Sequence, residues 1–131
     1  MQDKPRGVIR NREYASQIRD FSGLLIGNIT PTDIDGFIEY KDKCFIFVET
    51  KHNNAKLPFG QRLAFERLAD ACNKYKPTLF IIGSHNTIGD IDFANCLVTE
   101  YRFDFKWRIQ ETTITVKDMI MRFISSIKGV T

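Results

Sequence analysis

Asp35, Glu49 and Lys51 are the residues whose types and spacing best fit a chemical role. Asp35 lies in an extended, alternating stretch over residues 32–40, and Glu49 and Lys51 close a second such stretch over residues 44–51. Two carboxylates and an ammonium group at the ends of paired strands can hold a divalent metal ion and a water molecule beside a phosphate. Such an arrangement suits hydrolysis of a nucleic-acid backbone.

The three side chains meet only if the two stretches form a hairpin of suitable register. Both stretches are rich in Phe, Ile and Val and are bounded by turn-forming residues, which is typical of a hairpin. If the loop has three residues, Tyr40 pairs with Cys44. The same register places Asp35 directly opposite Glu49, with Cβ atoms about 4.5–5.5 Å apart, so both carboxylates can reach one metal ion. A two-residue loop would place the two acids on opposite faces, and the segment lacks the Asn-Gly or Asp-Gly pair of such a turn.

Length and composition indicate a single folded domain over residues 1–131. A chain of 131 residues can form a sizeable core, and 43% hydrophobic and 27% charged residues are ordinary for a globular protein. The three cysteines are odd in number and widely spaced, which favours buried thiols in a reducing compartment over a disulfide framework or a zinc site. No apolar run reaches the roughly 18–20 residues of a membrane span, and the basic amino terminus is no signal peptide. We therefore expect a cytoplasmic protein.

The net charge of +3 permits a nucleic-acid partner but does not by itself indicate one. Positive charge is concentrated near the amino terminus. The basic residues there are Lys4, Arg6, Arg10, Arg12 and Arg19. Contact with phosphates and a merely solvated surface are both open interpretations of this cluster.

Hydrophobic periodicity predicts an α/β sandwich around a mixed sheet. The predicted elements are a helix over 11–21, strands over 24–29, 32–40 and 44–51, a helix over 60–75, a strand over 78–82, an edge strand over 101–109 and a helix over 116–127. Loops are expected over 52–58 and 83–92, and Thr115 or Asp118 is expected to serve the amino end of the last helix. A helix that joins two strands favours parallel pairing of those strands.

The predicted edge strand alternates charged and aromatic residues. In one continuous strand, Arg102 and Arg108 would share the charged face, whereas Trp107 would lie on the aromatic face. The favoured interpretation of Trp107 is a core aromatic residue, and the alternative is stacking on a base of a single-stranded substrate.

The order of elements and acids resembles the PD-(D/E)xK nuclease superfamily. Thr32-Asp33-Ile34-Asp35-Gly36 matches the first half of the family motif, and Glu49-Thr50-Lys51 matches the second. Pro31 does not adjoin Asp35, a departure that the family tolerates. The spacing from Glu49-x-Lys51 to Gln61 is similar to that of the small VRR-Nuc and phage-type resolvase-like nucleases, in which a glutamine opens the helix after the catalytic strand. The resemblance covers about residues 10 to 85.

The resemblance implies a restriction-endonuclease-like three-layer sandwich, with an antiparallel meander and a parallel strand in a mixed sheet flanked by helices. Asp35, Glu49 and the carbonyl group of Thr50 would bind Mg²⁺ or Mn²⁺, which prefer oxygen ligands. Lys51 would orient the attacking water or stabilise the developing negative charge.

Glu13 and Gln61 extend the implied site, and each has a simpler interpretation. Glu13 matches the acid that the family carries on its first helix, or it forms an ion pair on the solvent side of that helix. Gln61 lies on the apolar stripe of the helix over 60–75, so its amide would point toward the end of the sheet. The alternative is a helix-start residue with local hydrogen bonds only.

Three more side chains near the site have open roles. Asp33, opposite Lys51 in the predicted register, is interpreted as an outer metal ligand, a partner for Lys51 or a cap. His52 follows Lys51 and could touch phosphate, and His85 ends a strand whose carboxyl end could face a ligand. The alternative for each histidine is simple exposure to solvent.

We therefore expect a Mg²⁺- or Mn²⁺-dependent nuclease that hydrolyses phosphodiester bonds, with DNA as the favoured substrate. A chain of this length leaves no room for a separate recognition domain. The enzyme would be nonspecific, would read branched, flapped or single-stranded DNA, or would pair with another copy as a homodimer. The alternatives are a non-catalytic nucleic-acid- or protein-binding domain that keeps the nuclease fold, and a hydrolase that acts on a nucleotide or on RNA.

Overall fold

The computed structural model describes residues 17, 20–53 and 55–127. The chain divides into two compact units, Met1–Pro31 and Thr32–Thr131, which are described separately. In the first unit, the 3-10 helix η1 (Ser22–Leu24) precedes a tight turn, in which Ile26 and Ile29 exchange backbone hydrogen bonds of 2.8 and 2.9 Å.

The prediction of a strand over 24–29 is wrong, because the chain reverses at Gly27. This glycine has a φ of 60°, a left-handed conformation that other residues rarely adopt, and it lies at the first central position of the turn. Most of the helix predicted over 11–21 lies outside the described residues.

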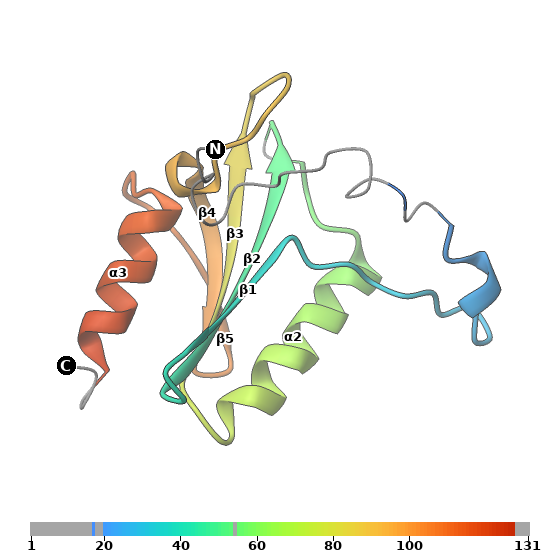
Figure 1. Ribbon diagram of the computed structural model, residues 1–131, viewed down its shortest axis with the longest axis horizontal. Helices are drawn as coiled ribbons and strands as arrows, with labels where there is room; N and C mark the ends of the chain where they lie inside the picture. The colour runs from blue at the N-terminus through green and yellow to red at the C-terminus, as the bar shows by residue number, and fades with distance from the viewer. Residues whose placement is uncertain (1–16, 18–19, 54, 128–131) are drawn as a thin grey trace, which may run out of the picture. The chain divides into compact units, whose positions relative to one another are not determined.

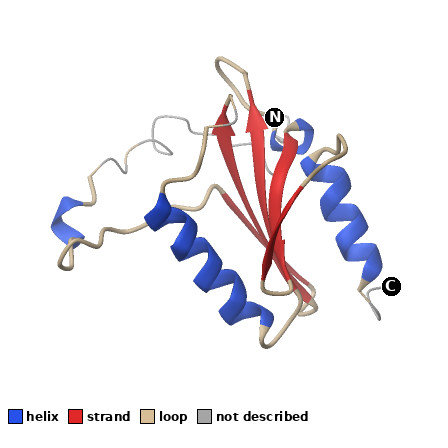
Figure 2. Cartoon of the chain, turned by 180° about the vertical axis from the view of Figure 1, so that it is seen from behind, coloured by secondary structure: helices blue, strands red, loops and turns tan. Residues whose placement is uncertain are grey.

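The second unit contains a five-stranded mixed sheet with a helix on each face. In spatial order the strands are β1 (Gly36–Tyr40), β2 (Cys44–His52), β3 (Thr78–His85), β4 (Leu97–Phe103) and β5 (Lys106–Ile109). Helix α2 (Phe59–Asn73) joins β2 to β3, which pair in parallel, and all other neighbouring strands are antiparallel. Helix α3 (Val116–Ser126) follows β5 and lies on the face opposite α2 (Figures 1 and 2). The predicted α/β class, the mixed sheet and the parallel pair are confirmed.

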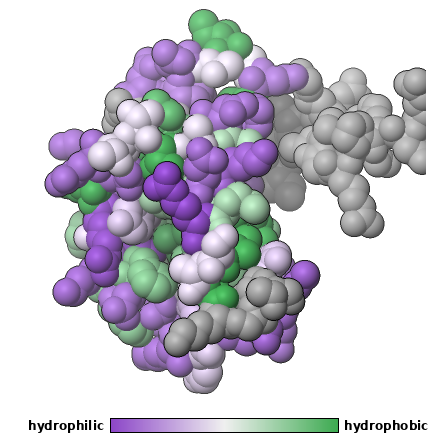
Figure 3. All heavy atoms as spheres, turned by 90° about the vertical axis from the view of Figure 1, so that its left-hand side faces the viewer, coloured by the Kyte–Doolittle hydropathy of each residue, from purple (hydrophilic) through white to green (hydrophobic). Residues whose placement is uncertain are grey.

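Strand alternation divides the core of this unit into two layers. On the side of α2, Phe47, Phe80 and Ile82 pack with Phe65 of the helix. The opposite layer is formed by Cys44, Ile46, Val48, Leu79 and Ile81 of the strands, together with Val116 and neighbouring apolar residues of α3. The outer surface of the unit on the α3 side is covered mostly by hydrophilic residues (Figure 3). Both central strands are therefore buried on both faces, as expected for a parallel pair between helices.

The hairpin of β1 and β2 has the predicted register. Tyr40 pairs with Cys44, and the three-residue connection places Lys41 and Asp42 in left-handed conformations with φ of 49° and 61°. Gly36 pairs with Val48, and a Cβ atom on Gly36 would lie only 2.7 Å from the Val48 side chain. A larger residue would therefore push β1 away from β2 immediately beside Asp35.

The prediction of one edge strand over 101–109 is wrong, because the chain turns at Asp104 and Phe105. Both residues have positive φ, 53° and 66°, and Arg102 pairs with Trp107 across the resulting β4–β5 hairpin. Directly paired residues share a face, so Arg102 and Trp107 lie together on the α2 side. The charged and aromatic residue types continue to alternate through the turn residues, which is why the sequence pattern resembles a single strand, although the turn itself reverses which face the odd-numbered residues occupy.

Several boundaries also differ from the sequence prediction, and β1 begins at Gly36 rather than at residue 32. Strand β3 continues beyond Ile82 to His85, so the loop predicted over 83–92 begins later, and a 3-10 helix η2 (Phe93–Asn95) follows it. Thr115 caps α3, where its Oγ1 accepts a hydrogen bond from the Asp118 N–H at 3.1 Å. The expected cap of the last helix is thereby confirmed. Across the described ranges, no helix combines the length and apolar character needed to cross a membrane.

Substitution of Arg102 tests the β4–β5 hairpin, because in this hairpin Arg102 lies against α2. The Arg102 guanidinium is buried and makes two hydrogen bonds of 2.8 Å to the Asp70 carboxylate. We predict that Arg102→Met lowers the free energy of unfolding by about 2–3 kcal/mol, because Asp70 loses its bidentate partner in a partly buried position. Arg108→Met, at an exposed position of β5, should change it by less than about 0.5 kcal/mol. Urea unfolding measures both values, and equal losses would contradict the hairpin.

Candidate active site

Glu49 is a buried carboxylate at the carboxyl-terminal part of β2. Only 4% of the residue is exposed, and it follows Phe45 and Phe47 on the face covered by α2. Its Oε1 accepts a hydrogen bond from the backbone N–H of Asp35 at 3.1 Å, and its Oε2 accepts one from the Gln61 side-chain amide at 3.1 Å. The carboxylate is thus held in place by the segment directly before β1 and by α2.

Asp35 makes the reciprocal contact from the residue before β1. Its Oδ2 accepts a hydrogen bond from the backbone N–H of Thr50 at 2.9 Å and a longer one from the Thr50 hydroxyl at 3.4 Å. Asp35 is exposed, in contrast to Glu49. The two acids therefore lie together at one end of the β1–β2 hairpin, as the three-residue loop required.

Lys51 and Gln61 complete a chain of contacts with Glu49. The Lys51 ammonium donates a hydrogen bond to the Gln61 Oε1 at 3.0 Å and lies 3.5 Å from the Glu49 Oε2. Gln61 is in the first turn of α2, and its amide accepts from the lysine while donating to the carboxylate. The prediction that Gln61 points to the end of the sheet is confirmed, and the alternative of local bonds only is excluded.

The environment of Glu49 disfavours its negative charge. The pKa of its carboxyl group is raised to about 7, mainly by burial and then by the negative charge of Asp35, while Lys51 opposes the rise. The buried guanidinium of Arg102, in contrast, is well compensated, because Asp70 and Glu66 both lie within ion-pair distance of it. Glu49 is left with an electrostatic cost that a nearby cation would reduce.

The donors around Glu49 fit a hard divalent cation rather than zinc. Two carboxylates, from Asp35 and Glu49, supply oxygen atoms, and their mutual repulsion is the kind of cost that Mg²⁺ or Mn²⁺ offsets. Within the part of the chain that the structure describes, no group of three or more His, Cys, Asp or Glu residues is arranged to hold a metal ion. A Mg²⁺ ion needs fewer protein ligands than that, since it usually keeps several waters.

Among the described residues, the side chains of Asp33, His52 and His85 make no hydrogen bond or ion pair with this cluster. Asp33 precedes β1, which begins at Gly36, so the predicted pairing of Asp33 with Lys51 is not formed. Glu13 lies outside the described residues. His52 and His85 end β2 and β3, where they pair with each other with ring centroids 5.3 Å apart. Alternation places them on the face opposite Glu49 and Lys51.

Sequence reasoning missed the contacts that hold the first turn of α2. Arg62, next to Gln61, makes hydrogen bonds of 2.7 and 2.9 Å to Glu100 of β4, and its guanidinium stacks 4.3 Å from the Trp107 ring centroid. Trp107 in turn donates to Glu66 at 3.0 Å and packs against the α2-side core, which confirms its interpretation as a core residue. Glu100 is 38 residues away from Arg62 in sequence, so no local pattern could have revealed the pair.

The raised pKa of Glu49 gives a stability prediction. From about pH 4.5 to about pH 7 the folded chain holds a proton on Glu49 that the unfolded chain has released, so stability falls as the pH rises through this window. Glu49→Gln is neutral at every pH, and we expect it to flatten this fall and to be more stable than the parent at about pH 8. Urea unfolding at about pH 5 and about pH 8, both in EDTA, provides the comparison. Parallel pH dependences of parent and variant would contradict the assignment.

In comparisons with known proteins, no family model, no curated protein and no solved structure matches the chain.

Proposed function

We propose that this chain is a metal-dependent nuclease that hydrolyses phosphodiester bonds, with DNA as the favoured substrate. The observation that supports it most directly is the group formed by Asp35, Glu49, Lys51 and Gln61 at one end of the sheet. It combines two carboxylates, one of them buried, with a lysine that is tied to the buried carboxylate through an amide.

Each residue of the group has a distinct part in the proposed reaction. Asp35, Glu49 and the carbonyl group of Thr50 would hold Mg²⁺ or Mn²⁺, which when bound lowers the pKa of a coordinated water and offsets negative charge on the phosphate. Lys51 stabilises the charge that develops on the phosphate oxygens or orients the attacking water. Gln61 positions Lys51 relative to Glu49, because its amide contacts both side chains.

The fold supports this proposal at a coarse level. A mixed sheet with a parallel pair between helices places the ends of β2 and β3 at a common edge, where ligands of α/β proteins commonly bind. A restriction-endonuclease-like fold, a cytoplasmic location and a homodimer that holds two strands belong to the same proposal.

A non-catalytic domain that binds nucleic acid or protein is the second candidate. One observation favours it: both acids already accept main-chain hydrogen bonds, Glu49 from Asp35 and Asp35 from Thr50. These contacts satisfy some of the carboxylate lone pairs without any ion. The two acids could therefore serve only to stabilise the pairing of β1 with β2.

Removal of either acid separates the two candidates. We predict that Asp35→Asn and Glu49→Gln each reduce cleavage to less than about one-hundredth of the parent rate, because the metal loses a charged ligand. The assay uses single-stranded, duplex, flapped and four-way DNA, and matched RNA, with Mg²⁺, with Mn²⁺ and with EDTA. Asp118→Asn, which removes an exposed carboxylate on α3, is the matched control and should cleave like the parent.

The same assay can reject the proposal. Full activity of Asp35→Asn with Mg²⁺ would show that the metal site is misassigned. Binding of DNA by the parent without cleavage in either metal would favour the non-catalytic domain instead. Circular dichroism of each variant establishes whether a loss of cleavage reflects a loss of the fold.

Lys51 and Gln61 should affect the rate more than the binding of metal. We expect Lys51→Met to lower kcat by about 100-fold and Gln61→Met to lower it by about 10-fold, because the first removes a charge and the second only its positioning. Isothermal titration with Mn²⁺ should show nearly unchanged affinity in both variants. A large loss of metal affinity in Lys51→Met, with an unchanged rate at saturating metal, would be inconsistent with these roles.

A further inference from the structure

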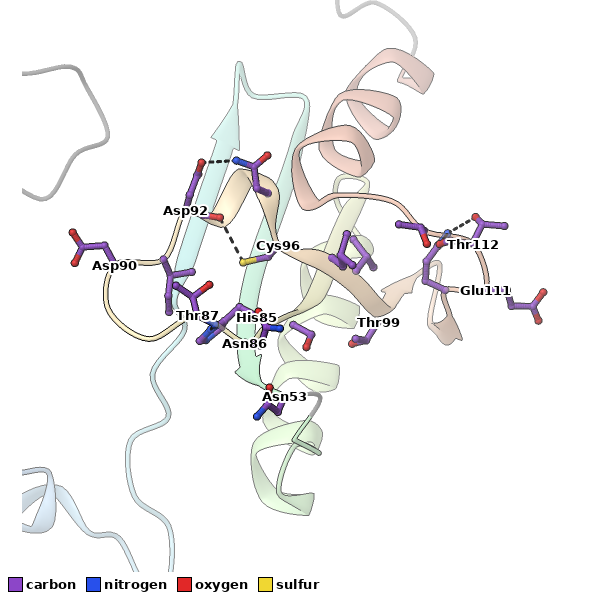
Figure 4. Close-up of a pocket in the computed structure, with 17 residues that line it drawn as sticks. Asn53, His85, Asn86, Thr87, Asp90, Asp92, Cys96, Thr99, Glu111 and Thr112 are labelled. Carbon is purple, nitrogen blue, oxygen red and sulfur yellow. Dashed lines mark hydrogen bonds between the residues drawn. The ribbon is translucent and has the colours of Figure 1, made fainter.

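A groove of about 980 Å³, lined mostly by polar residues, opens at the carboxyl end of β3 (Figure 4). None of the residues of the proposed site lines it. Its walls come from β4 and from the segments around residues 86–95 and 110–113. Ser84 and His85 line it at one end, and across the parallel pair they lie beside Lys51 and His52. The groove therefore starts one strand away from the proposed site.

The residues along the groove suit a nucleobase better than a run of phosphates. Among the described residues that line it there is no Lys or Arg, whereas Asp90, Asp92 and Glu111 are acidic. Phosphate backbones are bound mainly through such cations, so a chain of phosphates would be repelled here. Amide, hydroxyl and carboxylate groups are the ones that read the hydrogen-bonding edges of bases. Partly exposed Ile91 and Leu97, 41% and 46% accessible, add apolar surface against which a base can pack.

Several of these polar side chains are not engaged within the protein. In the part of the chain that is described, the side chains of Asn53, Asn86 and Glu111 make no hydrogen bond or ion pair, whereas Asp92 accepts from the Ala94 N–H and from the Asn95 amide. Asn53 and Asn86 lie at the same end of the groove as His85 (Figure 4). The groove thus offers two unengaged amides near its histidine end.

His85 is oriented to donate a hydrogen bond at that end. Its Nδ1 accepts from the backbone N–H of Thr87 at 3.2 Å, so in the neutral ring the proton is on Nε2. His52 lies against it edge to face, with ring centroids 5.3 Å apart. The end of the groove nearest Lys51 therefore carries one imidazole donor, from His85, that is suited to a phosphate oxygen, while the remainder carries base-reading groups.

We propose that this groove binds the base of an unpaired nucleotide, with its phosphate at the histidine end. The inference builds on the proposed nuclease function and narrows its substrate to single-stranded or flapped nucleic acid. A paired base has its hydrogen-bonding edge and both faces occupied in the duplex, so an unpaired base enters such a groove more readily.

The test is a binding titration of the full chain, with EDTA present so that no metal-dependent cleavage occurs. Amide NMR spectra are recorded with the four nucleoside 5′-monophosphates, with ribose 5-phosphate and with inorganic phosphate. We expect at least one nucleoside monophosphate to bind about tenfold more tightly than ribose 5-phosphate, with shifts centred on residues 84–87 and 97–99. Asn53→Ala and Asn86→Ala should each weaken that binding by about tenfold, the effect of one lost hydrogen bond of about 1.4 kcal/mol. Asn28→Ala, which does not line the groove, is the matched control.

Equal affinity for ribose 5-phosphate, or shifts located elsewhere, would overturn the groove assignment. The outcome is independent of the nuclease test. Nucleotide binding without any DNA cleavage would refute the proposed function alone, and metal-dependent cleavage without base-dependent binding would refute the groove alone. In the cleavage assay, Asn86→Ala should also lose preference for single-stranded over duplex DNA while Asn28→Ala retains it.

Discussion

Burial of β2 and β3 on both faces is the constraint on which the second unit depends. Phe80 stacks on Phe47 and Phe65 toward α2, with ring centroids 5.5 and 4.4 Å apart, while Ile46 and Ile81 are fully buried toward α3. Two such strands need a helix on each side, and their parallel pairing needs a long connection, which α2 provides. The polar residues that follow both apolar runs are consequently collected at one edge of the sheet.

That edge holds a carboxylate in an unfavourable state. Glu49 follows the apolar part of β2 directly, so its side chain is enclosed before the strand reaches solvent. Hydrogen bonds from Asp35 and Gln61 hold it, yet its pKa remains raised because burial and a second carboxylate outweigh Lys51. Elsewhere in the described chain, Arg102 with Asp70 and Arg62 with Glu100 show acids matched by bidentate guanidinium groups. An imperfectly compensated acid of this kind is typical of functional sites.

Strand alternation gives the edge two different chemical characters. Glu49 and Lys51 point toward α2, whereas His52 and His85 lie on the α3 side, where the groove begins. Acid and ammonium groups on one side suit metal and phosphate chemistry. On the other side, the amides suit a base and the His85 imidazole suits its phosphate. A nucleotide chain that crosses the ends of β2 and β3 would meet both.

Read alone, the sequence was sufficient for the features that depend on neighbours along the chain. The three-residue break between residues 40 and 44 set the register of β1 and β2, and with it the meeting of Asp35 and Glu49. The periodicity of the helix over 59–73 likewise placed Gln61 inward. These predictions held because strand and helix periods are local geometric properties.

Other features required the folded chain. The turn at Asp104 and Phe105 was not predicted, because charged and aromatic residue types alternate straight through it, whereas the turn reverses the face alternation and moves Trp107 to the face of Arg102. The groove combines loop residues from separate parts of the chain, and Arg62 meets Glu100 across 38 residues. The pKa of Glu49 likewise depends on how much protein surrounds it, a property of packing that sequence spacing does not encode.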